Sequence, residues 1–239
     1  MGRFILIPKW RRKYMAKIRI FDPRVLIAPI KNALADPHGI GRIELLIEES
    51  RKEDRHIFYD MPANALCIDC GVNKGWTSDA ILLLGGRVIG FEANPTAANF
   101  LSRKYTNNKN IEIHASAVSH KNGTANFTRQ HGDPFDLGGN IVAWKHSEKA
   151  KYETYQVPLV RLSEKILELK EDVYLLKLDV EGAEFDIIPD LIESGAYKKC
   201  KHIVCETHAR FFPDGKKRLE AINTLIKNNG ITNINLEWW

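Results

Sequence analysis

Ile68-Asp69-Cys70-Gly71-Val72-Asn73-Lys74-Gly75 (residues 68–75) is the stretch of sequence that decides the fold. The apolar run 65–68 predicts a buried strand, and residues 76–84 predict a helix directly after it. The two glycines allow a tight turn and a close approach of a ligand to the backbone. The pattern D-x-G-x-N-x-G differs from the G-x-G-x-x-G of nicotinamide-binding enzymes. Its carboxylate suits a cationic or amine-bearing ligand, although an ordinary glycine-rich turn is the alternative.

The rest of the sequence alternates between short apolar runs and longer helical patterns. The predicted strands are 87–91, 111–115, 173–178, 202–205 and 231–236, and the predicted helices are 95–105, 185–192 and 216–227. Such alternation is typical of an α/β fold with a mostly parallel, twisted sheet and helices on both faces. Because ligands of these sheets bind beyond the carboxyl ends of the strands, we expect the site residues there.

Three regions depart from this alternation. Residues 1–60 are predicted to form a basic helical extension that precedes a single domain over residues 61–239. Residues 119–124 are predicted to form a hairpin turn with Asn122-Gly123 at its tip. Residues 129–152 are predicted to make an excursion over one face, and long loops beside a ligand edge are often functional.

Glu92 is the first candidate site residue outside the opening stretch. It follows the strand 87–91 and lies 23 residues after Asp69, which is the spacing expected of a carboxylate that binds a ribose diol. Each hydrogen bond of that kind contributes about 1.5–3 kcal/mol. The alternative is that Glu92 caps the following helix, but Asn94 fits that role better.

Three further carboxylates follow the strand 173–178, at Asp179, Glu181 and Glu184. Carboxylates this close repel one another unless a cation, a proton or a helix N-terminus offsets their charge. A position at the start of a helix explains Glu184. Asp179 and Glu181 fall in the turn between strand and helix, so they remain candidate site residues.

These motifs, in this order, resemble the FkbM-type S-adenosylmethionine-dependent methyltransferases, a branch of the Rossmann-like class I methyltransferase fold. The resemblance covers about residues 65–210, and its most specific part is the D-x-E-G-x-E pattern of residues 179–184. The sequence departs from the family at Ala93, where proline is usual, and at Lys74, where an apolar residue is common. The segments that match are 68–75, 91–95, 117–119, 157–162 and 177–184.

The resemblance implies an S-adenosylmethionine-dependent O-methyltransferase whose acceptor is a sugar hydroxyl of a glycan or of a glycosylated metabolite. Asp179 and Glu181 would stand at the reacting edge, and Asp69 would suit the ammonium group of the cofactor. The residues that would bind the cofactor are Asp69, Gly71, Asn73 and Gly75 at its methionine end, Glu92 at its ribose, Ser116 and Ala117 at its adenine, and also Ala93.

A base that removes the proton of the acceptor hydroxyl would speed methyl transfer by about 10²–10⁴-fold. His208, just past the strand 202–205, is the best histidine candidate by its position and its intrinsic pKa. The alternative is that His208 caps the strand or packs at its end. Asp179, Glu206 and His208 could instead hold a divalent metal that acidifies the hydroxyl. No tight ligand spacing supports a metal, so none is predicted.

Other kinds of protein fit the sequence less well. A non-catalytic cofactor-binding or scaffold protein would not need the complete set of carboxylates. A nicotinamide oxidoreductase would need the missing G-x-G-x-x-G. A four-thiolate zinc site with Cys200 and Cys205 is disfavoured, because Cys67 and Cys70, three apart on a strand, point to opposite faces. Buried free thiols are expected instead.

Composition and charge give further bounds. The 239 residues, 44% of them hydrophobic, can form one substantial core. No apolar stretch reaches the roughly 18 residues that a membrane span needs, and a cytoplasmic protein is expected. Residues 1–35 hold nine Lys and Arg and one Asp, a charge of +8, which leaves −3 of the net +5 for the remainder. This segment could contact an acidic glycan, a membrane surface or a partner, and no nucleic-acid-binding signature accompanies it.

Overall fold

The computed structural model of the protein describes residues 55–142 and 151–238. Residues 1–54, which hold most of the predicted basic extension, lie outside the described residues, as do residues 143–150 and 239. All described residues belong to one compact unit. The predicted extension over residues 1–60 and its boundary therefore stay predictions.

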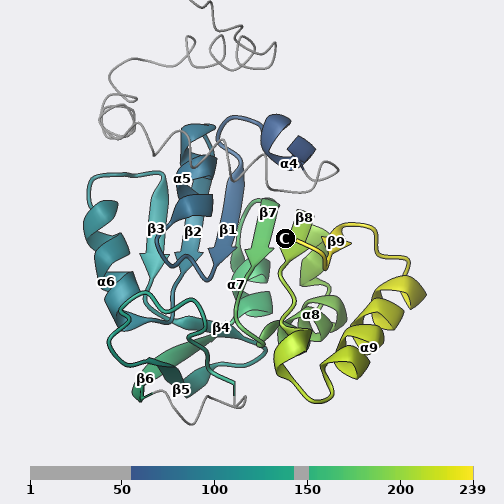
Figure 1. Ribbon diagram of the computed structural model, residues 1–239. Coiled ribbons are helices and arrows are strands. Elements are labelled where there is room, and N and C mark those ends of the chain that lie inside the picture. The colour runs from purple at the N-terminus through teal and green to yellow at the C-terminus, as the bar shows by residue number, and fades with distance from the viewer. Residues whose placement is uncertain (1–54, 143–150, 239) are drawn as a thin grey trace, which may run out of the picture. The chain divides into compact units, whose positions relative to one another are not determined.

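A six-stranded sheet in which every neighbouring pair is parallel forms the centre of the described structure (Figure 1). Its spatial order is β3-β2-β1-β7-β8-β9, so the chain order reverses between β1 and β7. Ligands of doubly wound sheets bind at such a reversal. The strands are β1 (Leu66–Cys70), β2 (Arg87–Phe91), β3 (Ile111–His114), β7 (Val173–Leu178), β8 (Cys200–Cys205) and β9 (Ile234–Asn235). The predicted parallel sheet is confirmed.

Helices cover both faces of this sheet because alternate strand residues point to opposite sides. Cys67 of β1 packs with Phe58 and Ile81 on one face, whereas Ile68 packs with Ile188 on the other. No helix of the described residues is long and apolar enough to cross a membrane. The helices are α4 (Arg55–Tyr59), α5 (Trp76–Leu83), α6 (Pro95–Lys104), α7 (Leu162–Glu168), α8 (Glu184–Glu193) and α9 (Gly215–Asn228).

The cysteines follow the same alternation along the strands. All four are buried and free, as the sequence predicts. Cys67 belongs to the core cluster of one face, and Cys70 belongs to the cluster of the other. The sheet therefore separates the two thiols of the C-x-x-C pattern, which could not bind one zinc ion together.

A second, three-stranded sheet follows β3, and the sequence analysis did not anticipate it. It contains β4 (Ala117–Ser119), β5 (Gly123–Gln130) and β6 (Tyr152–Arg161), with β6 in the middle. In Figure 1 it lies at the end toward which the arrows of β1, β2 and β3 point. The second sheet thus stands beside the edge where ligands are expected.

The predicted hairpin over residues 119–124 is wrong. The chain turns there, but β4 pairs with β6 in parallel and β5 pairs with β6 antiparallel, so β4 and β5 are not neighbours. Asn122 gives the physical reason, because its Oδ1 accepts a hydrogen bond from the Arg161 backbone N–H at 2.8 Å. Its amide nitrogen also donates to Glu164 at 2.6 Å. The turn is thereby fixed to the end of β6.

Phe58 of α4 offers a test of how the first described helix joins the core. Its side chain is 1% exposed and its ring centroid lies 5.9 Å from that of Trp238. Phe58→Ala should lower the free energy of unfolding by about 3–5 kcal/mol, because it removes a buried aromatic side chain and leaves a cavity. Urea-induced unfolding followed by circular dichroism measures this change.

Leu137→Ala is the matched control, since Leu137 is 75% exposed and its removal should change that free energy by less than about 0.5 kcal/mol. Equal, small losses for the two variants would contradict the described packing of α4.

Candidate active site

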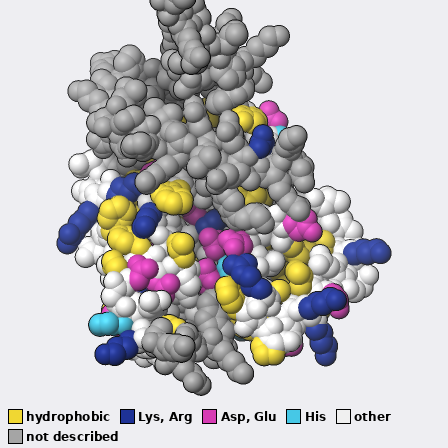
Figure 2. Space-filling model, viewed as in Figure 1, with side chains coloured by type: hydrophobic (Ala, Val, Ile, Leu, Met, Phe, Trp, Pro, Cys, Tyr) yellow, Lys and Arg dark blue, Asp and Glu magenta, His cyan; other side chains and the backbone are white. Residues whose placement is uncertain are grey.

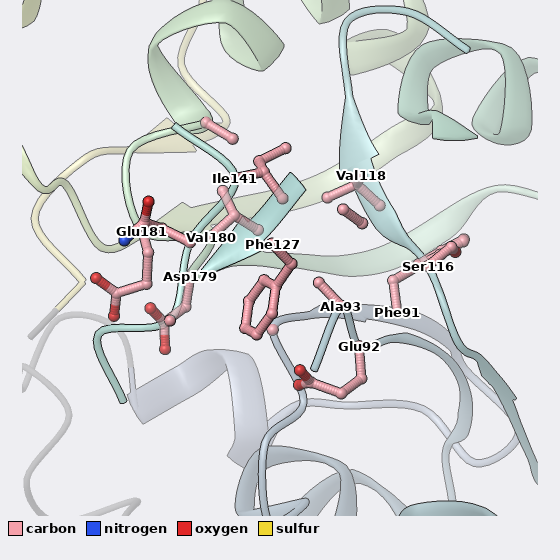
Figure 3. Close-up of a pocket in the computed structure, with 15 residues that line it drawn as sticks. Phe91, Glu92, Ala93, Ser116, Val118, Phe127, Ile141, Asp179, Val180 and Glu181 are labelled. Atoms are coloured by element: carbon pink, nitrogen blue, oxygen red, sulfur yellow. The ribbon is translucent and has the colours of Figure 1, made fainter. Parts of the chain in front are cut away.

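A pocket lies at the carboxyl edge of the main sheet, beside the reversal between β1 and β7, and the second sheet forms part of its wall (Figure 3). Its volume is about 60 Å³, and the ring of Phe127 narrows it. The carboxylates of Asp179 and Glu181 lie side by side on one flank of that ring, and the Glu92 carboxylate lies on the other. The predicted site residues that line the pocket are Gly71, Glu92, Ala93, Ser116, Ala117, Asp179 and Glu181.

The turn of residues 71–75 depends on its two glycines. Gly71 has φ +80°, and a Cβ at this position would overlap the carbonyl oxygen of Asp179. Gly75 has φ +86°, begins α5, and accepts a hydrogen bond from the Tyr105 hydroxyl at 3.2 Å. Glycine at these positions therefore lets β1 approach β7 and lets α5 start close to α6. Gly75 itself does not line the pocket.

Glu92 is held rigidly at the end of β2. Its Oε2 accepts a hydrogen bond from the backbone N–H of Asn73, and its Oε1 accepts one from that of Asn94, both at 2.7 Å. Burial raises the pKa of Glu92, and these two donors act against that rise. Asn94, whose Oδ1 accepts from the Thr96 N–H at 3.0 Å, caps α6. Each Glu92 oxygen keeps a lone pair with which it can accept a ligand hydroxyl.

Lys177 is a site residue to which the sequence analysis gave no role. Its ammonium group donates to the Gly71 carbonyl at 2.9 Å and lies 3.2 Å from Asp179 Oδ2 and 3.4 Å from Asp69 Oδ1. Burial acts to lower the pKa of Lys177, but the carboxylates of Asp179 and Asp69 outweigh it and raise that pKa. The available signal was the one charged residue in β7, a strand whose six residues are all buried.

Asp69 lies beneath the turn rather than in the pocket wall. Its side chain is fully buried, and its Oδ2 accepts a hydrogen bond from the Ser78 hydroxyl at 2.7 Å. Its Oδ1 has the Lys177 ammonium nearby but no hydrogen bond. The arrangement therefore connects Asp69 to Asp179 through Lys177, with both carboxylates held by one cation.

Ser116 brings an unsatisfied polar atom to the pocket. Its side chain is buried, and its hydroxyl has no hydrogen-bond partner among the described residues. Buried polar groups in folded proteins are nearly always paired, so an orphan that lines a cavity indicates a place for a polar ligand atom. Ala117 lies next to it in the same wall.

His208 lies just after β8, outside the pocket wall, and is surrounded by a cluster of carboxylate side chains. The side chain is 1% exposed, and its Nε2 is 3.3 Å from Glu181 Oε2 and 3.8 Å from both Asp179 Oδ1 and Glu206 Oε1. Burial acts to lower the pKa of His208, but the hydrogen bonds with Glu181 and Glu184 outweigh it and raise that pKa to about 10. Figure 2 shows acidic side chains and a histidine gathered at the end of β7.

The loop that follows β5 is attached to the turns of the site. The side-chain amide of Asn94 donates to the Pro134 carbonyl at 3.0 Å, and that of Asn73 donates to the Phe135 carbonyl at 3.4 Å. The ammonium group of Lys74 lies 5.3 Å from the centre of the Phe135 ring. The part of the predicted excursion around Pro134 and Phe135 therefore lies against the ligand edge. The first and last residues of the excursion belong to β5 and β6, and its residues 143–150 lie outside the described residues.

Comparison with known proteins agrees with this geometry. A model of the methyltransferase FkbM domain matches residues 69–231, which is more than half of the chain. The match begins at Asp69 and includes Glu92, Asp179 and His208. A comparison with curated proteins found no match. The chain belongs to the FkbM methyltransferase family, as its motifs predict.

Proposed function

We propose that the chain transfers a methyl group from S-adenosylmethionine to a hydroxyl of a sugar, in a glycan or in a glycosylated metabolite. Membership of the family makes the protein a methyltransferase. The finer proposal rests on the pocket, because Glu92 and Ser116 on one side suit a nucleoside while Asp179 and Glu181 stand on the other. A nucleoside-bearing methyl donor and an acceptor rich in hydroxyls match these two sides.

The residues around the 71–75 turn and the end of β2 would hold the cofactor. Glu92, fixed by two backbone donors, accepts hydrogen bonds from the ribose hydroxyls, and Ser116 meets a polar atom of the adenine. Gly71, Asn73 and Gly75 shape the turn near the methionine end, and Asp69 sets its charge from below. When bound, S-adenosylmethionine supplies an activated methyl group on a sulfonium.

The carboxylates at the end of β7 would hold the acceptor. Asp179 Oδ1 and Glu181 Oε2 lie 3.8 and 3.3 Å from the same atom, His208 Nε2, so the two carboxylates would accept hydrogen bonds from neighbouring hydroxyls of one sugar ring and orient the reacting hydroxyl toward the methyl group. The hydroxyl proton would pass to the carboxylate of Glu181 rather than to the predicted base His208, because the raised pKa of His208 keeps its imidazole protonated. The Nε2 atom of His208, 3.3 Å from Glu181 Oε2, would hold that carboxylate in place.

The basic segment of residues 1–35 lies outside the described residues. Its predicted contact with an acidic glycan, a membrane surface or a partner stays a prediction, and so does the cytoplasmic location. If the sugar acceptor is acidic, the basic segment would contact the same molecule that the pocket methylates.

The proposed function predicts saturable binding of S-adenosylmethionine and transfer of its methyl group. Isothermal titration calorimetry measures the binding, and a labelled-methyl transfer screen against lysate glycans and sugar nucleotides identifies the acceptor. A methylated sugar among the products supports the proposal. Absence of binding at high micromolar ligand would contradict it, and binding without transfer to any of these acceptors would favour a scaffold protein.

The ribose contact predicts that Glu92→Gln weakens S-adenosylmethionine binding by about 10–100-fold, because it removes a charge-assisted acceptor. Glu112→Gln is the matched control, since Glu112 lies on the neighbouring strand β3 and is exposed. Calorimetric titration of both variants compares the dissociation constants. An unchanged constant in a folded Glu92→Gln protein would remove Glu92 from the cofactor site.

The role of His208 predicts that His208→Ala lowers kcat by about 10²–10⁴-fold while leaving S-adenosylmethionine affinity nearly unchanged. Because His208 is buried, Glu181→Gln provides a second variant with the same expected direction, and circular dichroism verifies the fold of each. His131→Ala, at an exposed histidine, should retain full turnover. Full activity in both His208→Ala and Glu181→Gln would exclude this group from proton transfer.

A further inference from the structure

We propose that Asp179, Glu206 and His208 bind a divalent metal cation at the acceptor side of the pocket, with Glu181 as a further donor. One ligand atom from each of the three residues lies within 4.8 Å of the others. The sequence offers this set only as an alternative without tight ligand spacing, because Asp179 follows β7 while Glu206 and His208 follow β8. The catalytic use of the cation rests on the proposed function, whereas its binding does not.

The distances between the donor atoms fit a single ion. The Nε2 atom of His208 lies 3.8 Å from Asp179 Oδ1, 3.8 Å from Glu206 Oε1 and 3.3 Å from Glu181 Oε2. Nitrogen and oxygen ligands lie about 2.0–2.2 Å from a small divalent cation, so two ligands of one ion are about 3–4 Å apart.

Glu184 orients the imidazole as a metal site requires. This fully buried carboxylate lies 3.2 Å from His208 Nδ1 and accepts the His208 backbone N–H at 2.7 Å. Its other oxygen accepts the Gly182 N–H at 2.7 Å. In metalloproteins the ring nitrogen that does not bind the metal usually donates to such a carboxylate, which leaves the other nitrogen directed at the ion. Glu184 is not itself one of the proposed ligands.

The charge of the cluster also calls for a cation. Four carboxylates surround one imidazole, and among the described cationic side chains Lys177 pairs with Asp179 at 3.2 Å and Arg210 pairs with Glu206 at 3.4 Å. Glu181 and Glu184 both pair with His208. Binding of a divalent ion to His208 Nε2 releases the proton of the imidazole, and the charge of the ion then replaces that proton as the compensation for Glu181 and Glu184.

The donor set selects the kind of cation. Carboxylate oxygens suit Mg²⁺ and Mn²⁺, and an imidazole shifts the preference toward the transition metal. Asp179 and Glu181 line the pocket, so an ion that they bind has a side open to the acceptor. Such an ion lowers the pKa of a hydroxyl that it contacts, which is the activation that a sugar acceptor needs.

Electron paramagnetic resonance of Mn²⁺ titrated into the full chain, without cofactor or acceptor, tests the site. We expect one saturable Mn²⁺ ion per chain, and we expect Glu206→Gln to raise its Kd by about tenfold or more, since it removes a ligand. Glu220→Gln, at an exposed glutamate of α9, should leave the Kd unchanged. Circular dichroism shows whether each variant folds, and Asp179→Asn is a second ligand variant with the same expected effect.

No saturable Mn²⁺ binding, or a Kd unaltered by both Glu206→Gln and Asp179→Asn, would overturn the site. The same titration separates this inference from the proposed function. Mn²⁺ binding in a chain that transfers no methyl group would support the site and refute the function. Methyl transfer that is insensitive to a chelator, in a chain that binds no Mn²⁺, would refute the site alone.

Discussion

A single buried ammonium group, that of Lys177, holds the centre of the site together. It bridges the carbonyl of Gly71 at the end of β1 and the carboxylate of Asp179 at the end of β7, and Asp69 lies on its other side. Removing one member of a buried set of charges strongly destabilises the folded protein, because the remaining charge is left buried and uncompensated. The turn of residues 71–75, the position of Asp179 and the shape of the pocket all depend on this cation.

The carboxylates of the site are stabilised in three different ways. Backbone N–H groups hold Glu92, a lysine holds Asp179, and an imidazole lies against Glu181. Neutral backbone donors fix the Glu92 side chain without placing a mobile charge beside it, which suits the role proposed for it as an acceptor of ribose hydroxyls. The groups at the end of β7 are coupled by charge, so a ligand or an ion that arrives there changes the protonation of its neighbours. The pocket thus has one side on which backbone N–H groups fix the carboxylate, and one side on which the charges of neighbouring side chains depend on one another.

Sequence patterns were sufficient for the main sheet and for seven of the fifteen residues that line the pocket. Short apolar runs predicted its strands, and the rule that ligands bind at the carboxyl ends of parallel strands selected Glu92, Asp179 and Glu181. The second sheet was missed because its strands β5 and β6 contain no short apolar run of the kind that predicted the main sheet; their polar and apolar residues alternate instead. The long 131–151 segment also separates the two strands in the sequence. The hairpin prediction failed because Asn122 bonds to Arg161, a contact that local turn rules do not contain. The grouping of Asp179, Glu206 and His208 arises from the pairing of β7 with β8, which brings distant residues to one edge.

The contact between Phe58 and Trp238 joins residues that lie 180 positions apart. The core cluster of that face therefore cannot close until nearly all of the described chain is available. During synthesis, α4 and β1 leave the ribosome long before Trp238 does, so their apolar side chains stay exposed to solvent until Trp238 has been made. Closure of this core cluster in this way depends on the synthesis of Trp238, and a chain that lacks Trp238 leaves α4, the first described helix, without that contact.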